Sequence, residues 1–348
     1  MRSSAPLALR WRESSWAGIV LAWVLAQVAW AGDLPQPTLP EADATLPIAA
    51  PPIATLFASP TTRDHVGRVV VPVMINGQGP FRFMVDTGAN HSTISPRLVR
   101  LLGLTPTQGT TILVDGITGT GQVAYVTIDR LQAGDLTIDG TELPVVWAPV
   151  MAGADGILGA AGLNEKSLLI DFQRNRVEIA SHVESLARAQ SIKIHAGRLT
   201  YGLVTLDTRV GRVPVLAVVD TGSERTLGNI ALRDALMARR APGATVQMTS
   251  VYGATEQVEP GELHAAPEIS IESLRITDVA IVYGDFHIFK VWALNDRPAM
   301  IIGMDVLGTV GSLSIDFKNQ NIYVASVRNS DNTLPFSHGS LSDMSQKK

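Results

Sequence analysis

The stretch FMVDTGAN at residues 83–90 places a carboxylate directly after a run of apolar residues. A carboxylate at the edge of a core is costly to ionise, because burial disfavours its charged form. The stretch AVVDTGS at 217–223 repeats the arrangement, and Asp220 follows Asp86 at an offset of 134 residues. Glycine after each acid permits a sharp backbone turn. The two stretches therefore predict two equivalent loops, each presenting one Asp.

Two further motifs recur in the same order after the Asp-Thr-Gly triplet. Residues 157–159, Ile-Leu-Gly, return as Ile-Ile-Gly at 301–303, an offset of 144. The tripeptide Ile-Asp-Phe at 170–172 returns at 315–317, an offset of 145. Three motifs in one order predict an internal duplication, with a ten-residue insertion between the first two motifs of the second copy.

Each copy has the same local pattern. Residues 67–77 alternate in polarity with a strand period and end in an Asn-Gly turn. Ser95 is placed to cap a short helix that begins with Pro96, and Asn229 has the capping position in the second copy. Each copy is therefore predicted to be mostly β, with one or two short helices.

A pseudo-twofold packing of the copies would bring Asp86 and Asp220 together. Two carboxylates within hydrogen-bond reach do not both ionise easily, so they share a proton. The ionised member can then take a proton from a water that attacks a carbonyl, while the neutral member donates to the carbonyl oxygen. This chemistry requires neither a cofactor nor a metal.

The paired triplets and second motifs resemble those of aspartic proteases of the retropepsin/pepsin group. The stretch IIGMDVLG at 301–308 is most similar to that of bacterial periplasmic retropepsin-like proteins. The resemblance covers roughly residues 64–328. It implies a mostly β, bilobal acid-protease fold with short helices and two pseudo-symmetric lobes, and it implies that Asp86 and Asp220 hold the attacking water.

The resemblance also implies roles for residues near the two acids. The hydroxyls of Thr87 and Thr221 would reach across to the opposite lobe, and Gly159 and Gly303 would pack beneath the Asp loops. The expected support of the acid pair comprises Thr87, Gly88, Ala89, Thr221, Gly222 and Ser223.

The chain departs from the family in its short lobes, its lack of cysteines and the residue after each triplet. That residue is Ala89 in one copy and Ser223 in the other. A Ser hydroxyl can hydrogen-bond its carboxylate and lower the pKa. We therefore expect Asp220 to be the more acidic member and Asp86 to hold the proton.

Two glycine-rich hairpins are candidates for flaps over the cleft, VDGITGTG at 114–121 and SVYGATE at 250–256. The flap candidates within them are Gly116, Gly119, Tyr252 and Gly253. The pepsin-like tyrosine of the first-lobe flap has no clear match, because Tyr252 belongs to the second copy. Ordinary tight hairpins are the alternative.

Other polar residues fit simpler interpretations. Asp171 and Asp316 are expected to bond the backbone of their own turns, and Asp115 and Asp139, each before Gly, are expected in hairpin turns. GITGTGQV lacks the following helix of a dinucleotide loop, and no Gly-x-Ser-x-Gly elbow is present. The seven histidines show no metal-ligand spacing, and His91 fits a surface or loop position better than the cleft.

The N-terminal segment predicts export. Three arginines precede an apolar block at 16–31, which ends in Ala-Trp-Ala and fits the small-x-small cleavage rule. An uncleaved membrane anchor is the alternative. The expected organisation is a signal peptide 1–31, a Pro-rich linker or pro-segment 32–62, a first lobe 63–182, a linker 183–191, a second lobe 192–328 and a disordered tail 329–348.

Composition narrows the function further. With 46% apolar and 17% charged residues the chain is typical of a folded protein, and its charge of −4 argues against a nucleic-acid partner. The lack of cysteine excludes disulfides, thiolate metal sites and a cysteine nucleophile. The sequence predicts a periplasmic or secreted monomeric aspartic endopeptidase acting on peptides or proteins. A non-catalytic peptide-binding module using the same cleft is the alternative.

Overall fold

The computed structural model describes residues 59–60, 62–63, 69–146, 151, 153–181, 191–199, 202–238 and 246–325. All of them belong to one compact unit, Ala54–Lys348. The predicted signal peptide, the predicted tail and almost all of the two predicted linkers lie outside the described residues. Within the described ranges no helix is long and apolar enough to cross a membrane.

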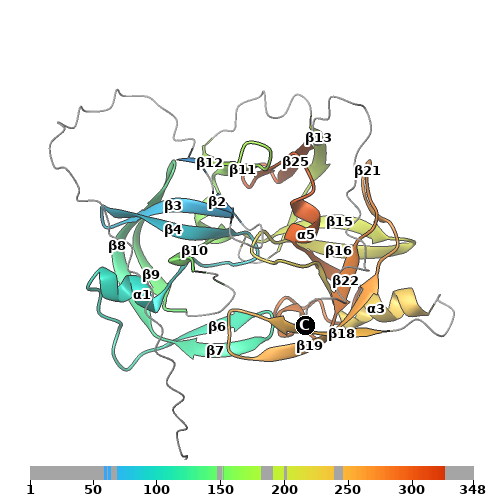
Figure 1. Cartoon of the computed structure of the whole chain (residues 1–348), viewed down its shortest axis with the longest axis horizontal. Coiled ribbons are helices and arrows are strands. Elements are labelled where there is room, and N and C mark those ends of the chain that lie inside the picture. Colours follow the sequence, from blue (N-terminus) through green and yellow to red (C-terminus); the bar gives the residue numbers. More distant parts are fainter. Residues whose placement is uncertain are drawn as a thin grey trace, which may run out of the picture. The chain divides into compact units, whose positions relative to one another are not determined.

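The two sequence copies fold into two mostly β lobes, as the duplication predicts (Figure 1). The first lobe contains β1 Ser59–Pro60, β2 Thr62–Arg63, β3 Val69–Ile75, β4 Gln78–Asp86, β5 Thr93–Ile94, α1 Pro96–Leu101, β6 Ile112–Gly116, β7 Gly119–Val123, β8 Tyr125–Ala133, β9 Leu136–Pro144, β10 Gly156–Gly159, the 3-10 helix η2 Ala160–Leu163, β11 Ser167–Asp171 and β12 Arg176–Ala180.

The second lobe repeats this order with additional elements. It contains β13 Ile192–His195, β14 Gly197–Arg198, β15 Val204–Val210, β16 Val213–Val219, β17 Leu227–Gly228, α3 Ile230–Met237, β18 Gln247–Tyr252, β19 Val258–Ala265, β20 Ile269–Ile271, β21 Leu274–Ile276, β22 Ala280–Tyr283, α4 His287–Val291, β23 Ala299–Ile302, α5 Met304–Leu307, β24 Ser312–Asp316 and β25 Asn321–Ala325.

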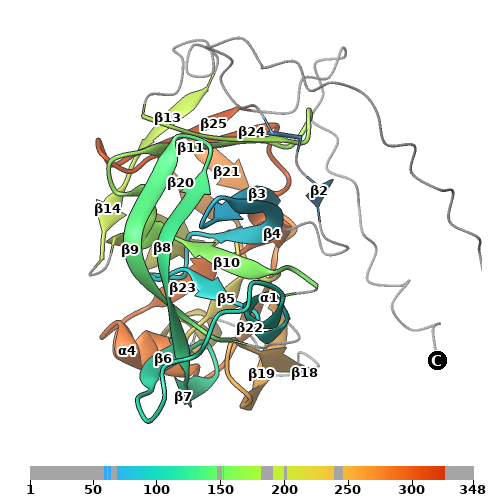
Figure 2. The same ribbon diagram turned by 90° about the vertical axis from the view of Figure 1, so that its left-hand side faces the viewer.

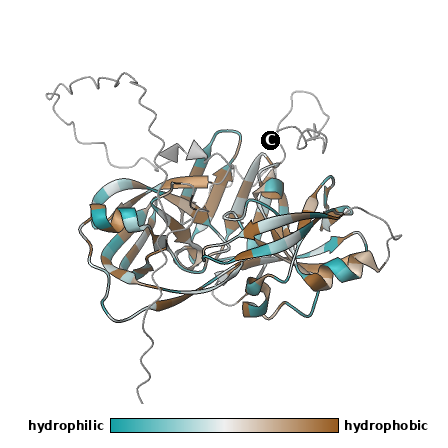
Figure 3. Ribbon diagram, turned by 60° about the horizontal axis from the view of Figure 1, so that its bottom comes forward, coloured by the Kyte–Doolittle hydropathy of each residue, from teal (hydrophilic) through white to brown (hydrophobic). Residues whose placement is uncertain are grey.

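The local signals of the sequence produce these elements. Asn76 and Gly77 take φ values of 49° and 76°, the left-handed pair that a tight hairpin between β3 and β4 requires. Ser95 accepts from the backbone N–H of Leu98 at 3.2 Å, and Asn229 caps α3 in the same way. Both predicted helix caps are confirmed. Brown and teal bands alternate along the strands, as expected for sheets with one buried face (Figure 3).

Each lobe has its own sheet, and the acid-bearing strand lies inside it. The first runs β5-β10-β4-β3-β8-β9, and the second runs β18-β19-β22-β17-β23-β16-β15-β20-β21. Parallel pairing of β10 with β4 sets Gly159 beside Asp86, and β23 pairs with β16 in the same way. The second motif of each copy therefore lies next to the triplet of that copy.

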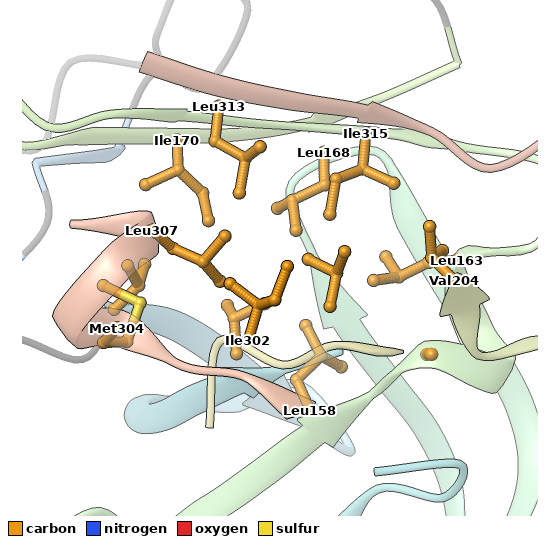
Figure 4. Close-up of a cluster of buried hydrophobic side chains, with 14 of the residues drawn as sticks. Leu158, Leu163, Leu168, Ile170, Val204, Ile302, Met304, Leu307, Leu313 and Ile315 are labelled. Atoms are coloured by element: carbon orange, nitrogen blue, oxygen red, sulfur yellow. The ribbon is translucent and has the colours of Figure 1, made fainter. Parts of the chain in front are cut away.

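A third sheet joins the lobes and covers a shared core. Its order is β1-β12-β11-β24-β25-β13, so β11 of the first lobe pairs antiparallel with β24 of the second (Figure 2). Beneath it pack buried side chains from both lobes (Figure 4). They include Leu158, Leu163, Leu168, Ile170, Val204, Ile302, Met304, Leu307, Leu313 and Ile315. The two lobes therefore share one hydrophobic core.

Some expectations need correction. The turn between β8 and β9 falls at Gly134 and Asp135, so Asp139 is not in a hairpin turn but pairs with Arg130 within the ladder. Asp115 likewise lies within β6 rather than at its turn. Among the described residues, strand pairing begins at Ser59, inside the predicted Pro-rich linker or pro-segment 32–62, because β1 extends the joining sheet.

Candidate active site

Asp86 and Asp220 occupy matched positions at the ends of β4 and β16. Asp86 is the last residue of β4, and Asp220 directly follows β16. A side chain on Gly88 would overlap the carboxyl group of Asp220, and one on Gly222 would overlap that of Asp86. A hydrogen bond joins the two carboxyl groups. The fold therefore brings the acids together, and both glycines are needed because the opposite carboxyl group fills the space of a Cβ.

The backbone of each loop holds its own carboxyl group. Oδ1 of Asp86 accepts from the N–H groups of Gly88 and Ala89, both at 2.9 Å. Oδ1 of Asp220 accepts from the equivalent N–H groups of Gly222 and Ser223, at 2.8 and 3.0 Å. These N–H groups favour the ionised form of each acid and fix its orientation.

Thr87 and Thr221 fasten the two loops to each other. The hydroxyl of Thr87 donates to the carbonyl of Val219 at 2.7 Å and accepts from the N–H of Thr221 at 3.1 Å. The hydroxyl of Thr221 donates to the carbonyl of Val85 at 2.8 Å and accepts from the N–H of Thr87 at 3.2 Å. Neither threonine is exposed. This reciprocal set fixes the separation of the lobes directly below the acids.

Gly159 and Gly303 lie against the Asp loops, as the resemblance implies. A Cβ on Gly159 would lie 2.6 Å from the backbone of His91, and one on Gly303 would lie 2.5 Å from the carbonyl oxygen of Arg225. Residues 160 and 304 donate backbone hydrogen bonds to the carbonyls of Ala89 and Ser223, both at 2.8 Å. Each second motif is therefore a platform for the neighbouring loop.

A carboxylate that the sequence analysis did not single out supports the second loop. Asp305 accepts from the N–H and hydroxyl of Thr226, at 3.0 and 2.8 Å. Thr226 also accepts from the N–H of Gly303 at 3.2 Å, as Ser92 does from Gly159 at 3.1 Å. Burial raises the pKa of Asp305, and the Thr226 hydrogen bonds oppose that shift. The sequence could have indicated these hydroxyl contacts, because Ser92 and Thr226 are both hydroxyl residues and are separated by the same offset as the two triplets.

The two acids differ in burial, and therefore in the free-energy cost of ionising them. Asp220 is 6% exposed, whereas Asp86 is only partly buried. Burial, and then the neighbouring Asp86, raise the pKa of Asp220 well above its ordinary value of 3.8, against the backbone hydrogen bonds of Gly222 and Ser223. Burial and the neighbouring Asp86 therefore both favour the protonated form of Asp220.

The expected effect of the Ser223 hydroxyl is wrong. That hydroxyl donates to the carbonyl of Arg225 at 2.8 Å, so its single hydrogen is not available to Asp220. Ser223 reaches the carboxylate through its backbone N–H, a contact that Ala89 makes equally well in the first lobe. The side-chain hydrogen bond on which the predicted order of acidity rested is therefore not formed.

The four flap candidates lie in two hairpins. Gly116 and Gly119 flank the turn between β6 and β7, and Gly253 follows β18. A Cβ on Gly253 would lie 2.7 Å from the hydroxyl of Thr118 in the other lobe, so the two hairpin tips touch. Tyr252 is 57% exposed.

The remaining candidates take structural positions. Asp171 accepts from the N–H groups of residues 173 and 174, and Asp316 accepts from that of residue 319, so both bond their own turns as predicted. His91 is exposed. No group of three or more His, Asp or Glu side chains suited to a metal ion occurs in the part of the chain that the structure describes.

Comparison with known proteins agrees with this geometry. The family model described as aspartyl protease matches residues 71–161 and 204–306, more than half of the chain. The two matched regions contain one acid loop and one second motif each. The chain therefore belongs to the aspartyl protease family and has its bilobal fold. No curated protein matches the sequence.

Proposed function

We propose that the protein is an aspartic endopeptidase in which Asp86 and Asp220 activate a water molecule. The observation that carries this proposal is the hydrogen-bonded pair of carboxyl groups, each packed over the glycine of the opposite triplet. Such a pair stays singly protonated over a wide pH range, because the second ionisation would place two like charges side by side.

The difference in burial assigns the two roles. Asp86, the more exposed acid, is the ionised base, and Asp220, with its raised pKa, is the acid. Asp86 takes a proton from the water while the water oxygen bonds to the peptide carbon. At the same time Asp220 gives its proton to the carbonyl oxygen. Asp86 then returns its proton to the amide nitrogen, the C–N bond breaks, and Asp220 recovers a proton from the diol.

Hydrolysis of a random peptide library by the protein, across acid to neutral pH, tests the proposal. We expect new amino termini to form with the wild type, whereas Asp86→Asn and Asp220→Asn should each abolish cleavage. Each variant removes one ionisable partner and keeps a side chain of the same shape. Asp139→Asn is the matched control, because it neutralises an exposed carboxylate of the first lobe that pairs only with Arg130 in the sheet.

Two results would contradict the proposal. Cleavage that survives in both dyad variants would place the chemistry elsewhere. Peptides that bind to the wild type but are never cut would identify the protein as a peptide-binding module that uses an extended segment of its ligand.

We further propose that the protein acts as a monomer in the periplasm or outside the cell, on peptide or protein substrates. One chain supplies both acids, and the N-terminal 31 residues have the composition of an export signal. N-terminal sequencing of the exported protein should give Gly32 as the first residue. An intact Met1 in a membrane fraction would instead indicate an anchored protein.

A further inference from the structure

The outer face of the second-lobe sheet carries a row of side chains that crosses β21, β20, β15 and β16. The last two strands lie side by side in Figure 1. Arg209 of β15 lies opposite Ser270 of β20 on one side and opposite Pro214 of β16 on the other. Ser270 lies in turn opposite Arg275 of β21. Opposite residues in a sheet point to the same face, and Val215, next to Pro214, is buried in the shared core on the other face.

Arg297 continues this row beyond β16. Ala299 of β23 pairs in parallel with Leu216 of β16. Two residues earlier on both segments, Arg297 therefore stands beside Pro214. The main chain is fixed there, because the carbonyl of Arg297 accepts from Nδ2 of Asn229 at 2.7 Å. The row therefore ends at a further arginine, and all of its members line one surface cavity of about 580 Å³.

Two of the three arginines, Arg209 and Arg297, form no ion pair with the described residues. The third, Arg275, pairs with Glu268 and also donates to two backbone carbonyls of its own turn. Arg209 and Arg297 are both exposed, and the short ring of Pro214 lies between them. An arginine presents its N–H donors in a planar fork that matches the oxygens of a carboxylate or a phosphate. The pair is therefore suited to an anionic group lying over Pro214.

This arginine pair is not part of the duplicated pattern. At the offset of 134 residues that relates the triplets, Arg209 corresponds to Ile75, which is buried in the core. At the offset of 144 that relates the second motifs, Arg297 corresponds to Gly153. The first lobe therefore forms the same kind of sheet with neither charge. A role in the lobe architecture does not explain why the second lobe exposes two arginines here.

The surroundings of the pair favour single carboxylates over a densely charged partner. Asp207 lies two residues before Arg209 on the same face of β15, and Glu272 lines the same cavity. These two acids repel a surface with many closely spaced negative charges, such as a nucleic acid or an anionic membrane. Leu216 and Pro298 also line the cavity and offer apolar contact to the aliphatic part of a Glu side chain. Carboxylates spaced along a polypeptide match both the arginines and their acidic neighbours.

The strand that carries Pro214 also leads to one of the two acids. Asp220 directly follows β16, six residues after Pro214, which is about 20 Å at a rise of about 3.3 Å per residue. An exposed pair of charges holds a free small anion only weakly in water. A carboxylate on a polypeptide that is already bound at the acids is instead held at a high effective concentration. The arginine pair therefore favours a tethered carboxylate over a free anion.

We propose that Arg209 and Arg297 form an exosite for acidic side chains of a polypeptide substrate, at least about six residues from the bond that is cut. The inference rests on the proposed function and adds a substrate class to it, namely polypeptides with Asp or Glu residues outside the part that is bound at the acid pair. The exosite contacts are the same in the ground state and in the transition state of hydrolysis. They therefore lower KM and leave kcat unchanged.

Matched substrates test the exosite. A peptide that the wild type cuts is extended at both ends by about twelve residues, twice the six-residue minimum, with either Glu or Gln in the outer half of each extension. We expect a KM about two- to tenfold lower for the Glu form than for the Gln form, as one or two exposed ion pairs provide. Added salt should reduce this preference. The unextended peptide is the control for the acid pair, and every arginine variant should cut it as the wild type does.

Substitutions of the two arginines form the second arm of the test. Arg209→Gln and Arg297→Gln should each reduce the preference for Glu, and the double variant with Glu at both positions should prefer an extension that carries Lys. Arg100→Gln is the matched control, because it removes one exposed arginine of the first lobe and changes the net charge by the same amount. A preference for Glu that survives in the double Gln variant, or that falls equally in Arg100→Gln, would overturn the proposal.

Binding measured without hydrolysis separates the exosite from the proposed function. Fluorescence anisotropy in the Asp86→Asn background gives the Kd of the labelled Glu and Gln peptides. If the wild type cuts no peptide, but the Glu form binds more tightly and loses this advantage in Arg209→Gln, the exosite is supported and the endopeptidase is contradicted. If the wild type cuts both forms with one KM and Asp86→Asn binds them equally, the exosite is overturned and the endopeptidase stands.

Discussion

Burial of Asp220 raises its pKa and thereby links the stability of the fold to pH. Its carboxyl group is almost fully buried beside a second acid, and these two causes keep its pKa well above 3.8. A group whose pKa is raised by folding binds its proton more tightly in the folded state than in the unfolded state. The free energy of unfolding therefore falls as the pH rises from the unfolded pKa to the folded one.

Replacing Asp220 with Asn should remove this loss of stability. We expect the free energy of unfolding of Asp220→Asn, minus that of the wild type, to increase as the pH is raised from about 4, the ordinary pKa of an Asp, towards neutral. Urea denaturation at a series of pH values measures the difference. Asp139→Asn, at an exposed pair, should show no such trend, and a difference for Asp220→Asn that stays flat or falls would refute the assignment of the proton.

At the scale of the residue, the sequence identifies the acids but not the directions of their neighbours. The offset of the triplets is sufficient to predict that Asp86 and Asp220 meet. The hydrogen bond expected from the Ser223 hydroxyl to Asp220 was mispredicted, because the hydroxyl donates to an acceptor in its own turn, the carbonyl of Arg225. Which acceptor a hydroxyl selects depends on distances of a few tenths of an ångström, and a residue pattern does not contain them.

At the scale of the element, the second motif of each copy is a strand end that supports an acid loop. The Gly159 position has no space for a methyl group, since its neighbours are the backbone of His91 and the carbonyl of Ala89 rather than a movable side chain. Room for a Cβ at this position can therefore be made only if β10 moves relative to the loop that follows Asp86.

Gly159→Ala should therefore destabilise the fold by about 1–3 kcal/mol, as overpacking of a filled core does, and lower kcat/KM because the loop of Asp86 is displaced. Gly121→Ala is the matched control for stability. A Cβ there meets only a methyl of Thr255 at an ordinary 3.7 Å, so the change should stay within about 0.5 kcal/mol. Chemical denaturation measures both variants, and equal stability of the two would show that β10 has room to move.

Local elements with strong turn or cap residues were the predictable ones. The Asn76–Gly77 turn and the caps Ser95 and Asn229 formed where expected, because each depends on a few adjacent residues. The prediction that Asp139 lies in a hairpin turn was wrong, since Gly134, in the left-handed region, closes that hairpin instead. Contacts such as His287 with Asp115 join residues 172 apart, and no local pattern indicates them.

At the scale of the whole molecule, the duplication predicts two lobes, but not the sheet that joins them. The sequence shows β11 and β24 only as repeated Ile-Asp-Phe segments. In the structure they pair directly with each other, Leu168 opposite Ile315, and close a core to which both copies contribute. The partner of a strand is decided by the assembly of both halves, and so neither half alone contains this information.

The joining sheet has a further consequence for how the two halves can differ. Its order is symmetric about β11 and β24, so two separate identical subunits would be able to associate through the same edge. A homodimer of that kind would carry every amino-acid change twice, once on each side of the axis. When both halves lie in one chain, an amino-acid change can occur in one half alone. One half can gain Asp305 and α4 while the other keeps Ala161 and a shorter connection, which permits a division of labour between the halves.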